Sequence, residues 1–221
     1  MNVDLLAKIG PGFVLPALVV AVVAYFCGCF NGAVIVSKYI LRDDVRKHGS
    51  GNAGLTNFYR TFGGPLTLVV ILTDVLKAIV AVWVGILVAK YFVLDDALVI
   101  ALGKYWAGTF CLIGHMFPCM FQFKGGKGIL SGGTIAIMMD WRVALVVWGG
   151  FLVLAIITKW VSLGSCWAGL SFPFVSWFVY QDVVILLLAI VCGGLILWKH
   201  RGNIKRILKG EESKFSFHHK K

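Results

Sequence analysis

The chain has 221 residues, of which 59% are hydrophobic and only 14% are charged. Soluble domains carry about 25% charged residues, so this composition excludes an ordinary soluble protein and predicts an integral membrane protein. The formal net charge is +11. Because the basic residues lie mainly between hydrophobic runs, we expect them to set membrane topology and to bind anions, with no nucleic-acid partner.

Seven apolar runs follow one another along the chain. A transmembrane helix needs about 20 apolar residues, and only the fourth run is clearly short. That run contains a Gly-Gly pair, and such a helix is tolerated at membrane depth where other helices cover it. The predicted fold is therefore an all-α integral membrane protein with seven transmembrane helices in one domain, residues 1–221. The runs are residues 12–31, 66–89, 97–114, 129–139, 143–158, 161–180 and 183–198.

The charges between these runs predict the orientation. Alternate segments hold sixteen Lys and Arg residues on one side and three on the other, Lys8, Lys90 and Arg142. Cytoplasmic segments carry the excess of Lys and Arg, so the N-terminus is expected outside and the C-terminus in the cytoplasm. An uncleaved first span fits the N-terminal sequence better than a signal peptide. The loops 32–65 and 115–128 and the segment after residue 198 then share the cytoplasmic side.

The first polar stretch is HGSGNAGLTNFYR, residues 48–60. Gly49, Gly51 and Gly54 are expected to adopt positive φ and to gather backbone N–H groups around an anion. Arg60 supplies a forked, permanent positive charge that suits phosphate. A simple turn before the second span is the alternative, but such a turn needs few donors. The other donors of the stretch are Ser50, Asn52, Thr56 and Asn57.

The second polar stretch is GHMFPCMFQFKGGKG, residues 114–128. A Walker A loop ends in Gly-Lys-Ser/Thr, whereas here Gly128 follows Lys127, so this is not a nucleotide-binding loop of that type. Gly125 and Gly126 still let a phosphate approach the main chain, and the following helix would point its N-terminus at the same anion. Lys124 is equally well explained as a charge flanking a membrane span.

The third polar stretch is KHRGNIKRILKGEE, residues 199–212. Its apolar residues recur at helical spacing with basic residues between them, which predicts an amphipathic segment along the inner leaflet. That explanation does not cover His200 and Asn203. These two residues are three apart and share a helical face at the end of the last span, so we assign them to a site.

Two polar pairs lie in or beside the spans. Asp74 and Lys77 are three residues apart on the second span and can neutralise each other; a structural and a functional role are both open. Ser162 and Ser165 lie at the cytoplasmic start of the sixth run, where Ser162 is expected to cap the helix. No Cys and His residues have metal-ligand spacing, so neither a metal nor another cofactor is predicted.

The three polar stretches together resemble the signatures of the bacterial acyl-phosphate-dependent glycerol-3-phosphate acyltransferases, the PlsY family. Their order and spacing fit, and with the hydrophobic runs the resemblance covers essentially the whole chain. Departures are small: Ile129, Leu130 and Ser131 stand where the family usually has Val, Ala and Thr, and Ile207 replaces Leu. The larger Leu130 puts the acyl-chain preference in doubt more than the reaction.

The resemblance implies transfer of a fatty acyl group from acyl phosphate to the first hydroxyl of glycerol 3-phosphate. The products would be lysophosphatidic acid and phosphate, made at the cytoplasmic face of the bacterial inner membrane, with an upstream enzyme supplying acyl phosphate. Implied catalytic residues are Ser50, His115, His200 and Asn203. Implied substrate-binding residues are Gly51, Asn52, Thr56, Asn57, Arg60, Gly125, Gly126, Lys127 and Ser165.

The proton acceptor stays open between His115, His200 and a substrate phosphate, whose second pKa is about 6. We favour the substrate phosphate. A covalent acyl-serine route is weaker, because Ser50 has only His48 near it in sequence and no carboxylate for a triad. The H-x-x-x-x-D arrangement of other acyltransferases is missing as well, since the residue five positions after each of His48, His115 and His200 is not Asp.

Two other functions fit parts of the chain. A phosphate or organic-anion transporter is the main alternative, but transporters usually show internal repeats and broken helices at mid-membrane. A scaffold that binds anionic lipid through the basic tail is the second alternative. The scaffold leaves the donors of residues 48–60 unexplained.

Overall fold

The computed structural model describes residues 10–215. The contributions of Lys8, Lys220 and Lys221 to the predicted orientation lie outside the described residues. Within the described part the protein is helical and has no strand, so the all-α prediction is confirmed. The longer helices are α2 (Val14–Cys29), α5 (Leu66–Phe92), α6 (Ala97–Met116), α7 (Ile129–Met139), α8 (Trp141–Thr158), α9 (Val161–Tyr180) and α10 (Val183–Lys199).

Each long helix coincides with an apolar run of the sequence to within three residues at either end. Helices α5, α6 and α8 are long and apolar enough to cross a membrane alone. If each of two bent pairs, α2 with residues 32–40 and α10 with α11 (Arg201–Leu208), is one span, the described residues hold up to five candidates. The protein is thus a multi-pass membrane protein, while seven spans and their orientation stay predictions.

Helices α2, α5 and α6 approach each other closely through glycine. A Cβ at Gly28 of α2 would collide with the main chain of Cys111 in α6, and one at Gly114 of α6 would collide with Tyr25 of α2. Gly85 of α5 and Gly103 of α6 face each other in the same way. Small residues at such crossings let helix backbones touch, and here they allow α2, α5 and α6 to pack closely.

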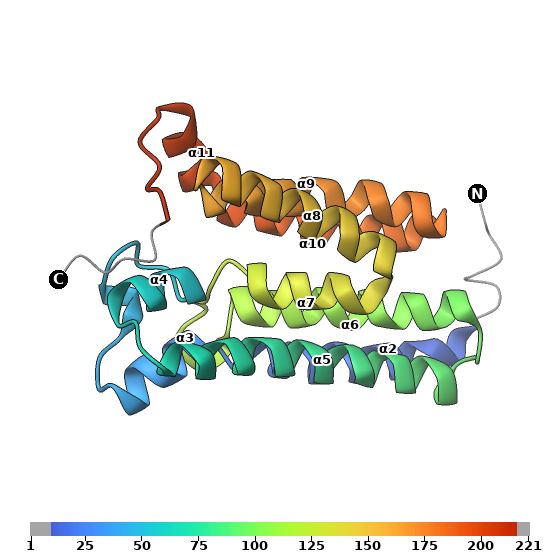
Figure 1. Ribbon diagram of the computed structural model, residues 1–221. Coiled ribbons are helices and arrows are strands. Elements are labelled where there is room, and N and C mark those ends of the chain that lie inside the picture. Colours follow the sequence, from blue (N-terminus) through green and yellow to red (C-terminus); the bar gives the residue numbers. More distant parts are fainter. Residues whose placement is uncertain (1–9, 216–221) are drawn as a thin grey trace.

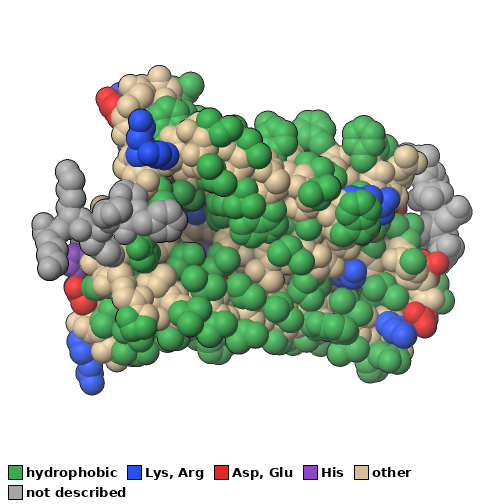
Figure 2. All heavy atoms as spheres, viewed as in Figure 1, with side chains coloured by type: hydrophobic (Ala, Val, Ile, Leu, Met, Phe, Trp, Pro, Cys, Tyr) green, Lys and Arg blue, Asp and Glu red, His purple; other side chains and the backbone are tan. Residues whose placement is uncertain are grey.

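The helices run roughly side by side, with α2 and α5 in one layer, α6 and α7 next, and α8, α9 and α10 beyond them (Figure 1). The short helices α4 (Leu55–Thr61) and α11 lie at the same end of this bundle. Figure 2 shows hydrophobic side chains over most of the visible face and charged side chains mainly toward the two ends. The polar chemistry is therefore displaced to an end of the bundle, as a membrane protein requires.

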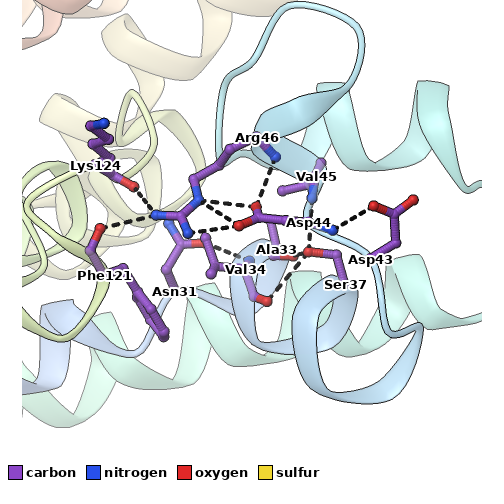
Figure 3. A network of polar contacts seen from close by, with 10 residues as sticks. All are labelled: Asn31, Ala33, Val34, Ser37, Asp43, Asp44, Val45, Arg46, Phe121 and Lys124. Carbon is purple, nitrogen blue, oxygen red and sulfur yellow. Dashed lines mark hydrogen bonds and ion pairs between the residues drawn. The ribbon is translucent and has the colours of Figure 1, made fainter.

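The segment 32–65, expected as a long loop, contains four short helical elements. Each is too short to show hydrophobic periodicity, so sequence could not predict it. Polar contacts hold the segment together; for example, Ser37 Oγ donates to the carbonyl of Ala33 at 2.7 Å and accepts from Val45 N at 3.1 Å (Figure 3). The elements are α3 (Gly32–Ile35), the π-helical turn Val36–Ile40, the 3-10 turn Val45–Lys47 and α4.

Arg46 connects this segment to the second polar stretch, residues 114–128, whose last part, residues 123–128, is the glycine-rich loop. Its guanidinium binds Asp44 through Nε and Nη2, and its Nη1 donates to the carbonyls of Phe121 at 2.9 Å and Lys124 at 3.3 Å (Figure 3). The hydrogen bonds with Arg46 hold the pKa of Asp44 below its usual value despite its partial burial. The segment 32–65 is thereby held against the second polar stretch.

Candidate functional site

A cavity of about 550 Å³ lies where the three polar stretches meet. Its wall includes ten of the thirteen residues singled out from the sequence: Ser50, Asn52, Thr56, Asn57, Arg60, His115, Lys127, Ser165, His200 and Asn203. Gly51, Gly125 and Gly126 do not line it. Polar residues more than a hundred positions apart in the chain thus share one cavity wall, which a set of unrelated turns would not produce.

Residues 48–54 form a compact loop that leads into α4, which contains the rest of the first polar stretch. Gly49 and Gly51 have φ of +55° and +69°, as expected. The expectation for Gly54 is wrong: its φ is −144°, because it is the extended residue that begins α4. The side chain of Asn57 holds the loop, since its Oδ1 accepts from Ser50 N at 3.0 Å and its Nδ2 donates to the carbonyls of Val45 and His48.

Arg60 lies on α4 at the cavity wall and is exposed. No carboxylate among the described residues forms an ion pair with it. A guanidinium offers five donors in a planar fork and stays charged at any ordinary pH. It is therefore available to a bound phosphate.

The glycine-rich loop is shaped by contacts with α6. A Cβ at Gly125 would collide with the carbonyl of His115, and one at Gly126 with the His115 ring and the carbonyl of Ala53. Gly128 has φ of +79° and immediately precedes α7. Gly125 and Gly126 are needed for space and Gly128 for conformation; together they place Lys127, and of the three only Gly128 lines the cavity.

Lys127 is partly buried, and its ammonium donates to Asn203 Oδ1. Burial, together with the nearby positive charge of Arg206, lowers the pKa of Lys127 to about 8. The first residues of α7, Ile129 and Leu130, also line the cavity. A lysine and a helix N-terminus are both complementary to a phosphate group.

The rim opposite α4 is built from α11 and the segment after it. Glu212 is half-buried as a residue but its side chain is only 6% exposed, and its carboxylate accepts from Asn203 Nδ2 and Ser162 Oγ at 2.7 Å each and from Arg206 Nε at 2.8 Å. Burial opposes ionisation of Glu212, but these hydrogen bonds outweigh it and lower its pKa. The capping role expected for Ser162 is wrong, because its hydroxyl donates to Glu212 and no side chain caps α9.

Glu212 lies within the third stretch, but sequence reasoning gave it no role. The only signal was an acidic pair, Glu211 and Glu212, in an otherwise basic segment. Since Asn203 Nδ2 donates to Glu212, its Oδ1 is turned toward Lys127. Glu212 thus orients the side-chain amide of Asn203 so that its oxygen, and not its nitrogen, faces Lys127.

His200 is buried at the junction of α10 and α11 and lines the cavity. Its Nδ1 lies 2.8 Å from the carbonyl of Ile196, which can only accept, so Nδ1 carries the proton. Burial lowers the pKa of His200 to about 4. The ring is therefore neutral near pH 7, with an unprotonated Nε2.

The floor of the cavity holds a buried group of charged side chains on α5 and α6. Lys77 Nζ lies 2.6 Å from Asp74 Oδ1 and 2.7 Å from His115 Nδ1, and Asp74 and His115 both line the cavity. The mutual neutralisation expected for Asp74 and Lys77 is confirmed as an ion pair. Its contact with His115, 38 residues farther along the chain, could not be read from local spacing.

A second, smaller cavity of about 30 Å³ adjoins the first and shares Ile129, Trp148 and Phe151 with it. Its wall is apolar and comes from α6, α7, α8, α9 and α10. A ligand with a charged head and a hydrocarbon tail would find a suitable surface for each part. Neither a polar metabolite alone nor a lipid tail alone would use both.

The family model described as glycerol-3-phosphate acyltransferase matches residues 18–210. The chain belongs to this family. A curated glycerol-3-phosphate acyltransferase of Thermoanaerobacter pseudethanolicus is 34% identical over 198 residues, which cover 90% of this chain and 95% of that relative. One of Finegoldia magna is 33% identical over 200 residues, covering 89% and 95%.

Two solved structures of the family have a similar fold. Both are of PlsY (YgiH), described as an integral membrane glycerol 3-phosphate acyltransferase. The glycerol 3-phosphate form gives a TM-score of 0.78 with 32% identity and covers 90% of this chain and 96% of its own. The lysophosphatidic acid form gives 0.74, again with 32% identity, and covers 90% and 95%.

Proposed function

We propose that this protein transfers a fatty acyl group from acyl phosphate to the sn-1 hydroxyl of glycerol 3-phosphate, giving lysophosphatidic acid and phosphate. The observation that carries the proposal is the pairing of a cavity containing Arg60 and Lys127 with an apolar cavity beside it. Family membership supports the same reaction class. Both substrates carry phosphate, so their binding next to each other requires positive charge on more than one wall.

The two cationic walls have different characters. Arg60 is exposed and belongs to α4, with the donors Ser50, Asn52 and Thr56 near it in the chain. Lys127 is more enclosed and is oriented by Asn203. Two phosphates held against such walls would be brought together without a bound cation, and the positioning contributes about 7 to 11 kcal/mol to catalysis.

The proposed reaction exchanges one acyl–oxygen bond for another. The glycerol hydroxyl oxygen attacks the acyl carbonyl, the bond from that carbon to the phosphate oxygen breaks, and phosphate leaves with the electron pair. The hydroxyl proton passes to a substrate phosphate in the route we favour. His200 is the protein alternative, because its Nε2 is unprotonated.

A covalent acyl-enzyme is not part of the proposal. Ser50 lines the cavity, but Nε2 of the neighbouring His48 lies 2.8 Å from Asp43 Oδ2. A serine nucleophile needs a base within hydrogen-bond reach. Direct transfer between the two bound substrates needs no such base.

We propose that the chain crosses the bacterial inner membrane seven times, with the cavity open to the cytoplasm. The excess of Lys and Arg in the segments that carry the site supports this orientation. An acyl phosphate is a labile mixed anhydride, so an enzyme that makes it would supply the donor in the same membrane.

The purified protein in detergent, given glycerol 3-phosphate and palmitoyl phosphate, should release phosphate and lysophosphatidic acid in equal amounts. Palmitoyl-CoA in place of palmitoyl phosphate should give no product above background. Product from palmitoyl-CoA alone would contradict the proposed donor. Uptake of glycerol 3-phosphate into proteoliposomes without product would instead support the transporter alternative.

A further inference from the structure

The buried floor of the cavity holds charge that the proposed reaction does not use. Asp74 and Lys77 are 1% and 6% exposed, and His115 is 2% exposed. Burying a charged side chain inside a membrane protein costs free energy, and such residues are functional candidates for that reason. The contacts of Lys77 indicate what that function is.

The ammonium of Lys77 has three N–H bonds, and three acceptors surround it. They are the carbonyl of Phe30 at 3.0 Å, Asp74 Oδ1 at 2.6 Å and His115 Nδ1 at 2.7 Å. The carboxylate of Asp74 balances its charge and also accepts from Gly32 N at 3.4 Å. An ammonium has no lone pair and can only donate. His115 Nδ1 must therefore be unprotonated.

A neutral imidazole with an unprotonated Nδ1 carries its proton on Nε2. That nitrogen lies beside Gly126, since a Cβ built there would meet Nε2 before any other atom. His115 also forms part of the cavity wall. The Nε2–H group therefore stands next to the glycine-rich loop as a donor.

We propose that Lys77 is a positioning residue that holds His115 in the Nε2–H tautomer, so that the ring donates a hydrogen bond to a bound anionic oxygen and does not act as the base. The proposal rests on the proposed function for the identity of that oxygen, a phosphate or the developing carbonyl oxyanion. The proposal gives the two histidines of the cavity different tautomers. His200 carries its proton on Nδ1, which donates to the carbonyl of Ile196, whereas His115 carries its proton on Nε2.

Nitrogen NMR of the ¹⁵N-histidine-labelled protein tests the tautomer without any turnover. The His115 resonances, assigned by their loss in His115→Gln, should show a pyridine-type Nδ1 and a pyrrole-type Nε2 near pH 7. A protonated Nδ1 in the unaltered protein would overturn the proposal. This measurement also gives a result if acyl transfer is never detected, so its failure and that of the proposed function are distinguishable.

The variant Lys77→Met removes the three donors. His115 Nδ1 lies 3.7 Å from Asp74 Oδ1, so it should gain a proton and pair with that carboxylate. We expect this change in the spectrum together with a drop in kcat/KM of about 10²-fold or more, the usual effect of losing one oxyanion donor. An unchanged His115 spectrum in a folded Lys77→Met protein would overturn the proposal.

Lys104→Met is the matched control. Lys104 lies on α6, eleven residues before His115, and donates to the carbonyl of Met139. This change should leave the His115 spectrum and the turnover as they are. If Lys77→Met does not fold, the spectrum of the unaltered protein decides alone.

Discussion

The large cavity and the small cavity beside it share Ile129, Trp148 and Phe151, yet their remaining walls have opposite chemistry. The first gathers Arg60, Lys127 and two histidines, and the second is lined by apolar side chains, Cys192 among them, and by glycine. We therefore expect binding of a head group and binding of a tail to be separable properties. Changes in the polar wall should affect every acyl donor equally, whereas changes in the apolar wall should discriminate by chain length.

The largest effect is expected for Lys127→Met. It removes the charge that faces Asn203 and should lower kcat/KM by about 10²–10³-fold for octanoyl and palmitoyl phosphate alike. Phosphate release measures both rates. Lys124→Met, three residues earlier and exposed, is the control and should change little. Equal losses in the two variants would mean that general surface charge, rather than a site, drives the reaction.

Gly126→Ala should come next. The added Cβ would press on the His115 ring and on the carbonyl of Ala53, so the loop that carries Lys127 must shift. Misplacement of a catalytic group by about 1 Å can cost about 10²-fold in rate, and we expect a loss of that order for both donors. Gly149→Ala on α8 is the control, because a Cβ there meets nothing within 4 Å. Full activity in Gly126→Ala would contradict this role of the loop.

Gly132→Leu addresses the apolar wall. Gly132 lines the small cavity, and a Cβ there makes ordinary contacts of 3.7 Å with Ile196 and Leu112, so the helix tolerates it while the larger side chain fills the space. The ratio of palmitoyl to octanoyl phosphate turnover should fall about tenfold or more. Gly194→Leu, at an open position, should leave that ratio unchanged. An equal loss of turnover for palmitoyl and octanoyl phosphate would contradict separate roles for the two cavities.

The smallest effect is in the pH dependence. Lys127 binds an anion in its charged form, and burial lowers its pKa to about 8. The charged fraction falls as pH rises through this value, so KM for glycerol 3-phosphate should rise about tenfold between pH 7 and pH 9. Arg60 stays charged over this range. In Lys127→Met the rise should disappear, and its persistence there would assign it to another group.

Much of the fold could be predicted from the sequence, because hydrophobic length alone marks a membrane helix. The run 161–180 coincides with α9 at both ends, and even the short run 129–139 matches α7. The short helices between residues 32 and 61 escaped prediction, since local polar contacts such as those of Ser37 and Asn57 shape them.

The sequence could predict those site residues whose type alone suggests phosphate binding, such as Arg60 and Lys127. It could not predict contacts between side chains that lie far apart in the sequence. Glu212 meets Ser162 fifty residues away, and Lys77 on α5 meets His115 on α6, 38 residues away. The prediction of a positive φ at Gly54 was wrong because the residue that begins α4 has an extended backbone.

The most direct test of the account is the product assay with radiolabelled glycerol 3-phosphate and palmitoyl phosphate, run in parallel on the unaltered protein, Lys127→Met and Lys124→Met. We predict one lysophosphatidic acid for each phosphate released by the unaltered protein and by Lys124→Met, and almost none from Lys127→Met. Phosphate release without lysophosphatidic acid, or equal product from all three proteins, would contradict a cavity that joins the two substrates.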